Sequence, residues 1–155
     1  MQLNITTYLD CSVEQAISHA KTTRLLKFVA HPLVHFTPIE PNAWPHTWAE
    51  GRYWVGVRIL GFMPFGKQAI VISLPKTGDG FLIRDNGYSS LVKVWDHTIS
   101  ITTDAGRTRY KDSVIIDAGV FTLPVWLFAQ VFYRHRQRRW RQLARQLAMG
   151  EALAP

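Results

Sequence analysis

The sequence predicts an α+β fold in which a curved antiparallel sheet wraps around one long carboxy-terminal helix. Three features of the sequence predict it: a series of strand-like segments joined by short turns, two short helical segments after the first strand, and a long amphipathic segment at the end. An amphipathic sheet must bury one face against another element, and the last helix is the only large one available. We therefore expect the sheet to enclose that helix and to leave a gap between them that can hold a ligand.

The first strand and the two short helices are marked by local residue chemistry. Residues 2–9 are rich in β-branched and aromatic side chains, which favour a strand. Asp10 and Ser12 supply N-cap oxygens for a helix that begins at Val13. A second helix is predicted over residues 22–30, because it must end before Pro32.

The middle of the chain predicts an antiparallel meander. Pro38, Pro41 and Pro45 break the chain before it begins. Short turns at 75–80, at Asn86-Gly87 and at 104–106 then join neighbouring strands as hairpins. The predicted strands span residues 48–60, 67–74, 81–85, 91–103 and 107–118.

The last helix is predicted over residues 123–149, with Pro124 in its first turn and Gly150 as a C-cap. Its apolar residues recur at three- and four-residue steps, as expected for a helix with one face on a sheet. These residues are Val125, Ala129, Phe132, Tyr133, Trp140, Leu143 and Leu147.

Length and composition predict one domain over residues 1–150 with a short tail at 151–155. The single cysteine, Cys11, excludes an intramolecular disulfide, and the first residues lack the basic and apolar pattern of a secretory signal. We therefore expect a cytoplasmic protein in which Cys11 is a small buried residue. The apolar run 118–133 contains Pro124 and Gln130 and is too short to predict a membrane span.

Four segments resemble one family in particular. They are Phe81-Leu82-Ile83-Arg84-Asp85, Asn86-Gly87-Tyr88, Trp95-Asp96-His97 and the segment from Gly106 to Asp112. With the element order, they make the chain similar to the START-like or SRPBCC superfamily, and within it to a bacterial ligand-binding subgroup with a Gly-Pro-Tyr-like turn, a Trp-x-His strand and a Gly-Thr-x-x-x-Asp-like strand. Here the proline is missing before Tyr88, and Arg107 intervenes between Gly106 and Thr108. The resemblance implies the helix-grip fold and a cavity for a lipid, polyketide or other hydrophobic small molecule.

His97 and Asp112 are the candidate polar pair. The alternation of strand residues places His97 on the same face as Trp95 and Ile99, and a tight turn around Ala105 brings Asp112 opposite it. One interpretation is a buried hydrogen bond that fixes the register of the two strands. The other is contact with a ligand, either by orienting a polar group or by moving a proton.

We expect a binding module, and whether it also catalyses a reaction is left open. The alternative is a polyketide cyclase or dehydratase, in which His97 acts as acid or base with support from Asp112, and Tyr110 or Arg84 polarises a carbonyl. The residues expected to contact the ligand are Tyr53, Trp54, Arg84, Tyr88, Trp95, His97, Tyr110, Asp112, Phe128 and Phe132.

The sequence predicts neither a metal nor a cofactor. His31 and His35 have a spacing that suits a metal on a helix, but Pro32 lies between them and no cysteine or carboxylate cluster accompanies them. Residues 61–66 contain two glycines without the pattern of a phosphate-binding loop. They predict an apolar turn, whose aromatic residues pack on the long helix or, alternatively, form a cavity mouth or touch a membrane.

The net charge of +7 comes largely from arginines of the last helix. Arg134, Arg138, Arg141 and Arg145 fall away from its apolar stripe and predict a solvated basic face. Their alternative role is attraction to an anionic membrane surface, which with Phe62 and Phe65 at the apolar turn would allow lipid exchange. Nucleic acid is not an expected partner, because no recognised binding motif accompanies the charge.

Overall fold

The computed structural model describes residues 1–150 and contains one seven-stranded antiparallel sheet with the order β1-β7-β6-β5-β4-β3-β2. Strands β2 to β7 follow one another as a meander, and β1 pairs with β7. The strands are β1 (Gln2–Leu9), β2 (Val34–Glu40), β3 (Gly51–Ile59), β4 (Met63–Ser73), β5 (Phe81–Ser89), β6 (Val94–Asp104) and β7 (Arg107–Asp117). The predicted tail at 151–155 lies outside the described residues.

Within the described residues, three α-helices and one short 3-10 turn complete the fold, and they are α1 (Val13–Ala20), α2 (Thr23–Ala30), η1 (Gly119–Phe121) and α3 (Thr122–Ala148). The start of α1 is fixed by a capping box, because Ser12 accepts from the backbone of Gln15 while the Gln15 side chain accepts from the backbone of Ser12. At the other end of the chain, Gly150 has the positive φ that follows many helix ends.

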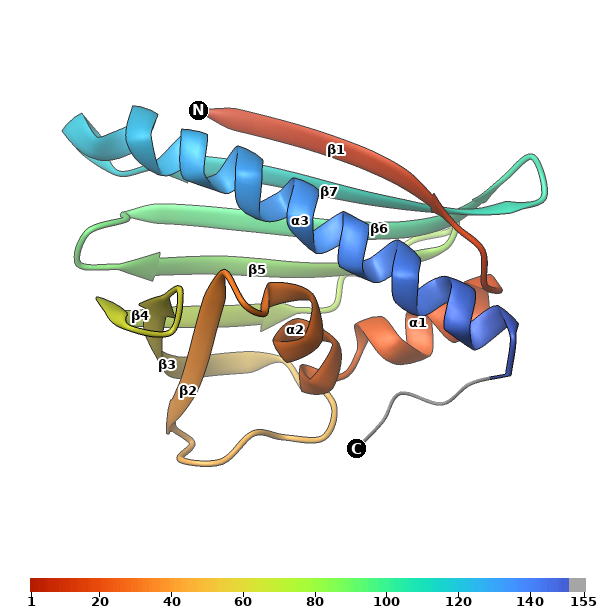
Figure 1. Cartoon of the computed structure of the whole chain (residues 1–155), viewed down its shortest axis with the longest axis horizontal. Coiled ribbons are helices and arrows are strands. Elements are labelled where there is room, and N and C mark those ends of the chain that lie inside the picture. Colours follow the sequence, from red (N-terminus) through yellow and green to blue (C-terminus); the bar gives the residue numbers. More distant parts are fainter. Residues whose placement is uncertain (151–155) are drawn as a thin grey trace.

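The sheet curves around α3, which runs diagonally across one of its faces (Figure 1). Three side chains of α3 hold it to β1: Trp126 donates to the carbonyl of Gln2, Gln137 to the carbonyl of Ile5, and Arg141 to the hydroxyl of Thr7. The predicted fold class, a curved antiparallel sheet with a long carboxy-terminal helix and two short helices after the first strand, is confirmed. No helix in residues 1–150 is long and apolar enough to span a membrane.

Strand β2 was not predicted, because its prolines were interpreted as breaks in the chain. Pro38 is tolerated because β2 is an edge strand, where a residue without an N–H need not cost a ladder hydrogen bond. The β2–β3 register also shifts between Pro38 and Glu40, and β2 ends before Pro41. The same edge position therefore permits both the proline and the irregular pairing.

The predicted turn at Asn86-Gly87 is wrong, since both residues lie inside β5 and face β6, where Gly87 pairs with Trp95. Glycine is required at this position because β4 and β5 approach each other closely, and not because the chain turns. A Cβ at position 87 would lie 2.7 Å from the carbonyl oxygen of Ala69 on β4. The chain turns only after Ser89, and β6 consequently begins at Val94 instead of residue 91.

Two further strand boundaries differ from the prediction. The hairpin between β3 and β4 turns at Leu60 and Gly61, both of which have positive φ, so β4 already begins at Met63. Strand β3 begins at Gly51, three residues later than predicted, and Trp48 is buried in the preceding loop. The expected packing of the apolar turn on the long helix is wrong for Phe62 and Met63, which are exposed.

Replacing Gly87 by alanine is expected to reduce the free energy of unfolding by about 2 kcal/mol, because the new methyl group meets backbone that cannot move aside cheaply. Urea denaturation of the variant measures the loss. Gly78→Ala is the matched control, since a Cβ there meets no atom within 4 Å. Equal stability of the two variants would contradict this account of Gly87.

Candidate ligand-binding cavity

A cavity of about 490 Å³ lies between the sheet and α3. Strands β2 to β6 form its floor and walls, while α2 and the first half of α3 cover it. Its lining is mainly aliphatic and aromatic, with Leu25, Phe36, Val57, Ile70 and Phe132 among the side chains that line it. The volume falls within the range of small-molecule sites in proteins.

The cavity reaches the protein surface near the start of α3. Phe121 lines the cavity and is also half exposed to solvent. Pro124 of α3, Phe65 of β4 and Leu91 after β5 line the same cavity. An apolar molecule can therefore enter at this end without crossing the packed core.

The polar part of the site is centred on Asp112 of β7, which is fully buried. Its Oδ1 lies 2.7 Å from Nε2 of His97 and accepts from the hydroxyl of Tyr110 at 3.1 Å. Its Oδ2 accepts from Nε2 of Gln137 at 3.0 Å. One carboxylate thus joins β6, β7 and α3, and every partner is itself buried.

These contacts set the protonation of the pair. Burial alone would raise the pKa of Asp112, but the charge of Arg136 and the hydrogen bond from His97 hold that pKa below its ordinary value. Burial lowers the pKa of His97. Neutral His97 therefore donates its Nε2 proton to ionised Asp112, and Nδ1 accepts no hydrogen bond from residues 1–150, on a residue that lines the cavity.

Arg136 of α3 is a buried cation that lines the same cavity. Its Nη2 donates to the hydroxyl of Tyr110 at 3.2 Å, and its guanidinium lies 5.7 Å from the ring of Tyr133. Its Nε lies 3.8 Å from Oδ1 of Asp112, beyond hydrogen-bond distance, and has no hydrogen-bond partner in the described residues. The charge of Arg136 is therefore compensated by Asp112, but its Nε donor has no acceptor in the described residues.

Asp85 of β5 is the second carboxyl of the site and lies directly across the β5–β6 ladder from His97. Its Oδ1 accepts from the backbone N–H of Val71 at 2.8 Å, where the β4–β5 ladder is interrupted. Burial raises the pKa of Asp85 to about 7, although the Val71 hydrogen bond and the charge of Arg136 oppose the rise. Asp85 is thus a carboxyl that gains and loses its proton near neutral pH.

Four of the residues expected to contact a ligand line the cavity: Trp95, His97, Phe128 and Phe132. Tyr110 and Asp112 lie behind them and support His97 and Arg136 through hydrogen bonds. The expected contact between His97 and Asp112 is confirmed, whereas contact of His97 with a ligand stays a prediction. The hydrogen bond fixes two strands, and the histidine also faces the cavity.

The other four expected residues do not line the cavity. Strand alternation places Trp54, Arg84 and Tyr88 on the opposite face of the sheet from Val57, Ile83 and Asp85. There Arg84 forms a bidentate ion pair with Asp96, and the rings of Trp54 and Tyr88 pack edge to face. Tyr53 has the inward parity but lies at the end of β3, where it packs on Trp48 and bonds to Ala49.

Sequence reasoning missed Asp85 and Arg136 as residues of the cavity. A signal for Asp85 existed in its parity with Phe81 and Ile83, but Asp85 was the last residue of the predicted strand, next to the predicted turn at Asn86-Gly87, and its parity was not used. Arg136 follows Phe132 by four residues and Tyr133 by three, which places it on the apolar stripe of α3. Because Arg136 belongs to an arginine-rich segment, its place on the apolar stripe was overlooked.

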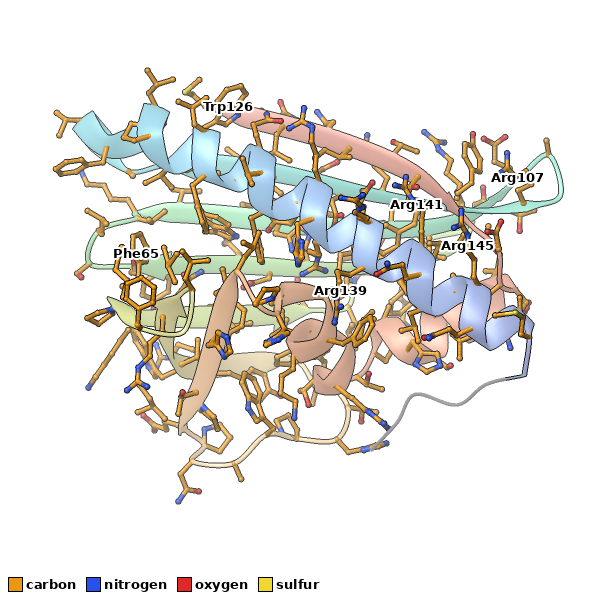
Figure 2. The ribbon with its side chains drawn as sticks, in the orientation of Figure 1. Phe65, Arg107, Trp126, Arg139, Arg141 and Arg145 are labelled. Atoms are coloured by element: carbon orange, nitrogen blue, oxygen red, sulfur yellow. The ribbon has the colours of Figure 1, made fainter. Side chains whose placement is uncertain are left out.

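Two arginines of the expected basic face lie far from the apolar hairpin tip (Figure 2). Arg141 and Arg145 project from the last part of α3, whereas Phe65 lies at the other end of the molecule (Figure 2). Arg145 pairs with Asp10, and Arg134 bonds to Gln130. At the tip, Phe62 and Met63 are exposed, while Phe65 lines the cavity.

Three further residues considered in the sequence analysis are His31, His35 and Cys11. His31 ends α2 and packs edge to face on His35 of β2. Within residues 1–150, no three His, Cys, Asp or Glu side chains gather as a metal site would require. Cys11 is buried, and burial raises the pKa of its thiol to about 11, which disfavours the reactive thiolate.

Solved structures from several bacteria share this architecture. A protein from Mycobacterium smegmatis is 14% identical with a TM-score of 0.66, and the match covers 92% of this chain and 89% of that one. A protein from Chromobacterium violaceum is 11% identical with a TM-score of 0.65, covering 92% and 96%. The AHSA1 protein from Silicibacter pomeroyi is 10% identical with a TM-score of 0.58, covering 97% and 100%.

This chain has the helix-grip fold. The fold implied by the START-like resemblance is therefore confirmed over nearly the whole chain. No protein-family model and no curated protein sequence matches the chain. Sequence identities of 10% to 14% support a shared fold and nothing more. Function therefore has to be argued from the residues of the cavity.

Asp85→Asn is expected to stabilise the protein at pH 8 by about 4 kcal/mol and to leave stability at pH 4 nearly unchanged. The folded-state pKa of about 7 exceeds the ordinary value of 3.8, so the native protein loses stability as pH rises between those values. Asparagine keeps the acceptor for Val71 and does not ionise. Urea denaturation across this pH range measures the effect, and Asp79→Asn in the exposed loop after β4 is the control. If the stability of the native and Asp85→Asn proteins changed with pH in parallel, the raised pKa of Asp85 would be contradicted.

Proposed function

We propose that the protein binds a hydrophobic small molecule in the cavity between the sheet and α3. The observation that carries the proposal is the cavity of about 490 Å³ with an almost wholly apolar lining and an opening beside Phe121. Burial of apolar ligand surface there contributes roughly 25 cal/mol per Å², which supplies most of the affinity. The few polar side chains fix the orientation of the ligand. The single reduced cysteine supports a cytoplasmic setting for this function.

Ile99→Trp is expected to weaken binding of the neutral apolar dye Nile red by at least about tenfold, because the indole fills the cavity that Ile99 lines. A fluorescence titration of the dye measures the dissociation constant. The matched control is Ile115→Trp, on the outer face of β7, where the side chain is 46% exposed. Equal affinity of the Ile99→Trp variant and the native protein would show that the dye binds elsewhere.

A second candidate function is proton transfer on the bound molecule. It is favoured by the Asp112–His97 hydrogen bond of 2.7 Å, which leaves Nδ1 of His97 as a free base on a residue that lines the cavity. Because burial lowers the pKa of His97, the base form predominates at neutral pH. A base in this position is suited to proton abstraction next to a carbonyl, which is the chemistry of a cyclase or dehydratase.

The second candidate predicts that the protein accelerates deuterium exchange at the acidic carbon of a hydrophobic 1,3-diketone. His97→Ala should slow that exchange by a factor of about 10² or more while the diketone still binds. Proton nuclear magnetic resonance follows the exchange, and dye displacement follows binding. If the native protein exchanges the diketone no faster than buffer does, His97 has no such role towards this compound and binding alone stands.

A further inference from the structure

We propose that the cavity selects apolar carboxylic acids, and that Arg136 and Asp85 together hold the carboxylate of the ligand. The inference rests on the proposed binding function and adds the chemical class of the ligand. It depends on two polar side chains that line an apolar cavity, the buried Arg136 and the partly exposed Asp85, each with part of its hydrogen-bonding capacity unused. Buried polar groups in native proteins nearly always have partners, so unused capacity at a cavity wall indicates a missing one.

Arg136 lines the cavity and has unused donors. A guanidinium carries five N–H groups, and among the described residues this one forms a single hydrogen bond, from Nη2 to Tyr110. Its Nε is fully buried without a hydrogen-bond partner. A planar fork of donors matches the two oxygens of a carboxylate better than it matches a single hydroxyl.

Asp112 cannot satisfy these donors, although it is the nearest carboxylate. Its Oδ1 already accepts from His97 and Tyr110, and its Oδ2 accepts from Gln137. The 3.8 Å between Oδ1 and Nε of Arg136 balances charge without a hydrogen bond. Within residues 1–150 no further acceptor bonds to Arg136, so a ligand in the cavity that Arg136 lines can supply one.

Asp85 supplies the second contact. Its Oδ1 is occupied by the N–H of Val71, and its other oxygen forms no hydrogen bond in residues 1–150. When protonated, this carboxyl donates a hydrogen bond, which a ligand carboxylate accepts. When ionised, it repels the same ligand.

The groups that act on Asp85 come from every element packed around it. Arg136 and Tyr133 face it from α3, His97 faces it from β6, and Val71 donates to it from β4. Asp96 of β6 adds a negative charge from the other face of that strand. An entering carboxylate adds a further negative charge and so favours the protonated form of Asp85, which couples binding to proton uptake.

The test compares three ligands that share one alkyl chain: dodecanoate, dodecanol and dodecylamine. Isothermal titration calorimetry or dye displacement at about pH 6 gives their dissociation constants for the full-length protein. Dodecanoate is expected to bind at least about tenfold more tightly than either of the others, because only it accepts from both side chains. From about pH 6 to about pH 8.5 its dissociation constant should rise by about tenfold, while that of dodecanol stays constant.

Two variants separate the roles of the side chains. Asp85→Asn keeps a donor at every pH, so dodecanoate affinity should become independent of pH between about pH 6 and about pH 8.5. Arg136→Met combined with Asp112→Asn removes the cation without leaving its carboxylate unpaired. This double variant should lose the preference for dodecanoate and still bind dodecanol, which also demonstrates that it is folded.

The outcomes distinguish the inference from the function on which it rests. If dodecanol or dodecylamine binds as tightly as dodecanoate, or if the double variant keeps the preference, the carboxylate site is overturned while the apolar cavity function stands. A pH-independent dodecanoate affinity in the native protein would exclude Asp85 from the site. If none of the three compounds binds, both the inference and the proposed binding function fail.

Discussion

The hydrogen bonds of the buried Asp112 carboxylate are the constraint on which the rest of the structure depends. Asp112 accepts from His97 of β6, Tyr110 of β7 and Gln137 of α3, and Gln137 also donates to the carbonyl of Ile5 on β1. These bonds fix where α3 crosses the sheet, because a shift of the helix would leave a buried charge without partners. The same bonds determine which side chains of α3 face the cavity, since Arg136 is the neighbour of Gln137.

The two carboxyls of the site respond in opposite ways to the cost of removing charge from water. Asp112 has enough donors and a cation nearby to remain ionised, and its pKa is lowered. Asp85 has one backbone donor and no ion pair in the described residues, and its pKa is raised to about 7. Asp112 therefore stabilises the fold at neutral pH, whereas Asp85 costs stability there.

Much of this architecture could be predicted from the sequence, because hydrophobic periodicity and capping residues act locally. The alternation around His97, the cap at Ser12 and the amphipathic pattern of α3 each led to the right element. Long-range relations were harder. Pro38 was interpreted as a break because only the sheet order shows that β2 is an edge, and Asn86-Gly87 was interpreted as a turn because only β4 shows why a glycine is needed. The sheet face on which Arg84 lies, and the position of Asp85 inside β5, likewise depend on strand boundaries that local signals fix poorly.

The central claim is that an apolar cavity in this helix-grip domain carries a buried polar anchor for its ligand. A crystal structure of the protein with dodecanoate tests the claim most directly. We predict the alkyl chain inside the cavity and the carboxylate within hydrogen-bond distance of the Arg136 guanidinium and the Asp85 carboxyl. A carboxylate directed to solvent beside Phe121, or a cavity that remains without the acid at saturating concentration, would contradict the account.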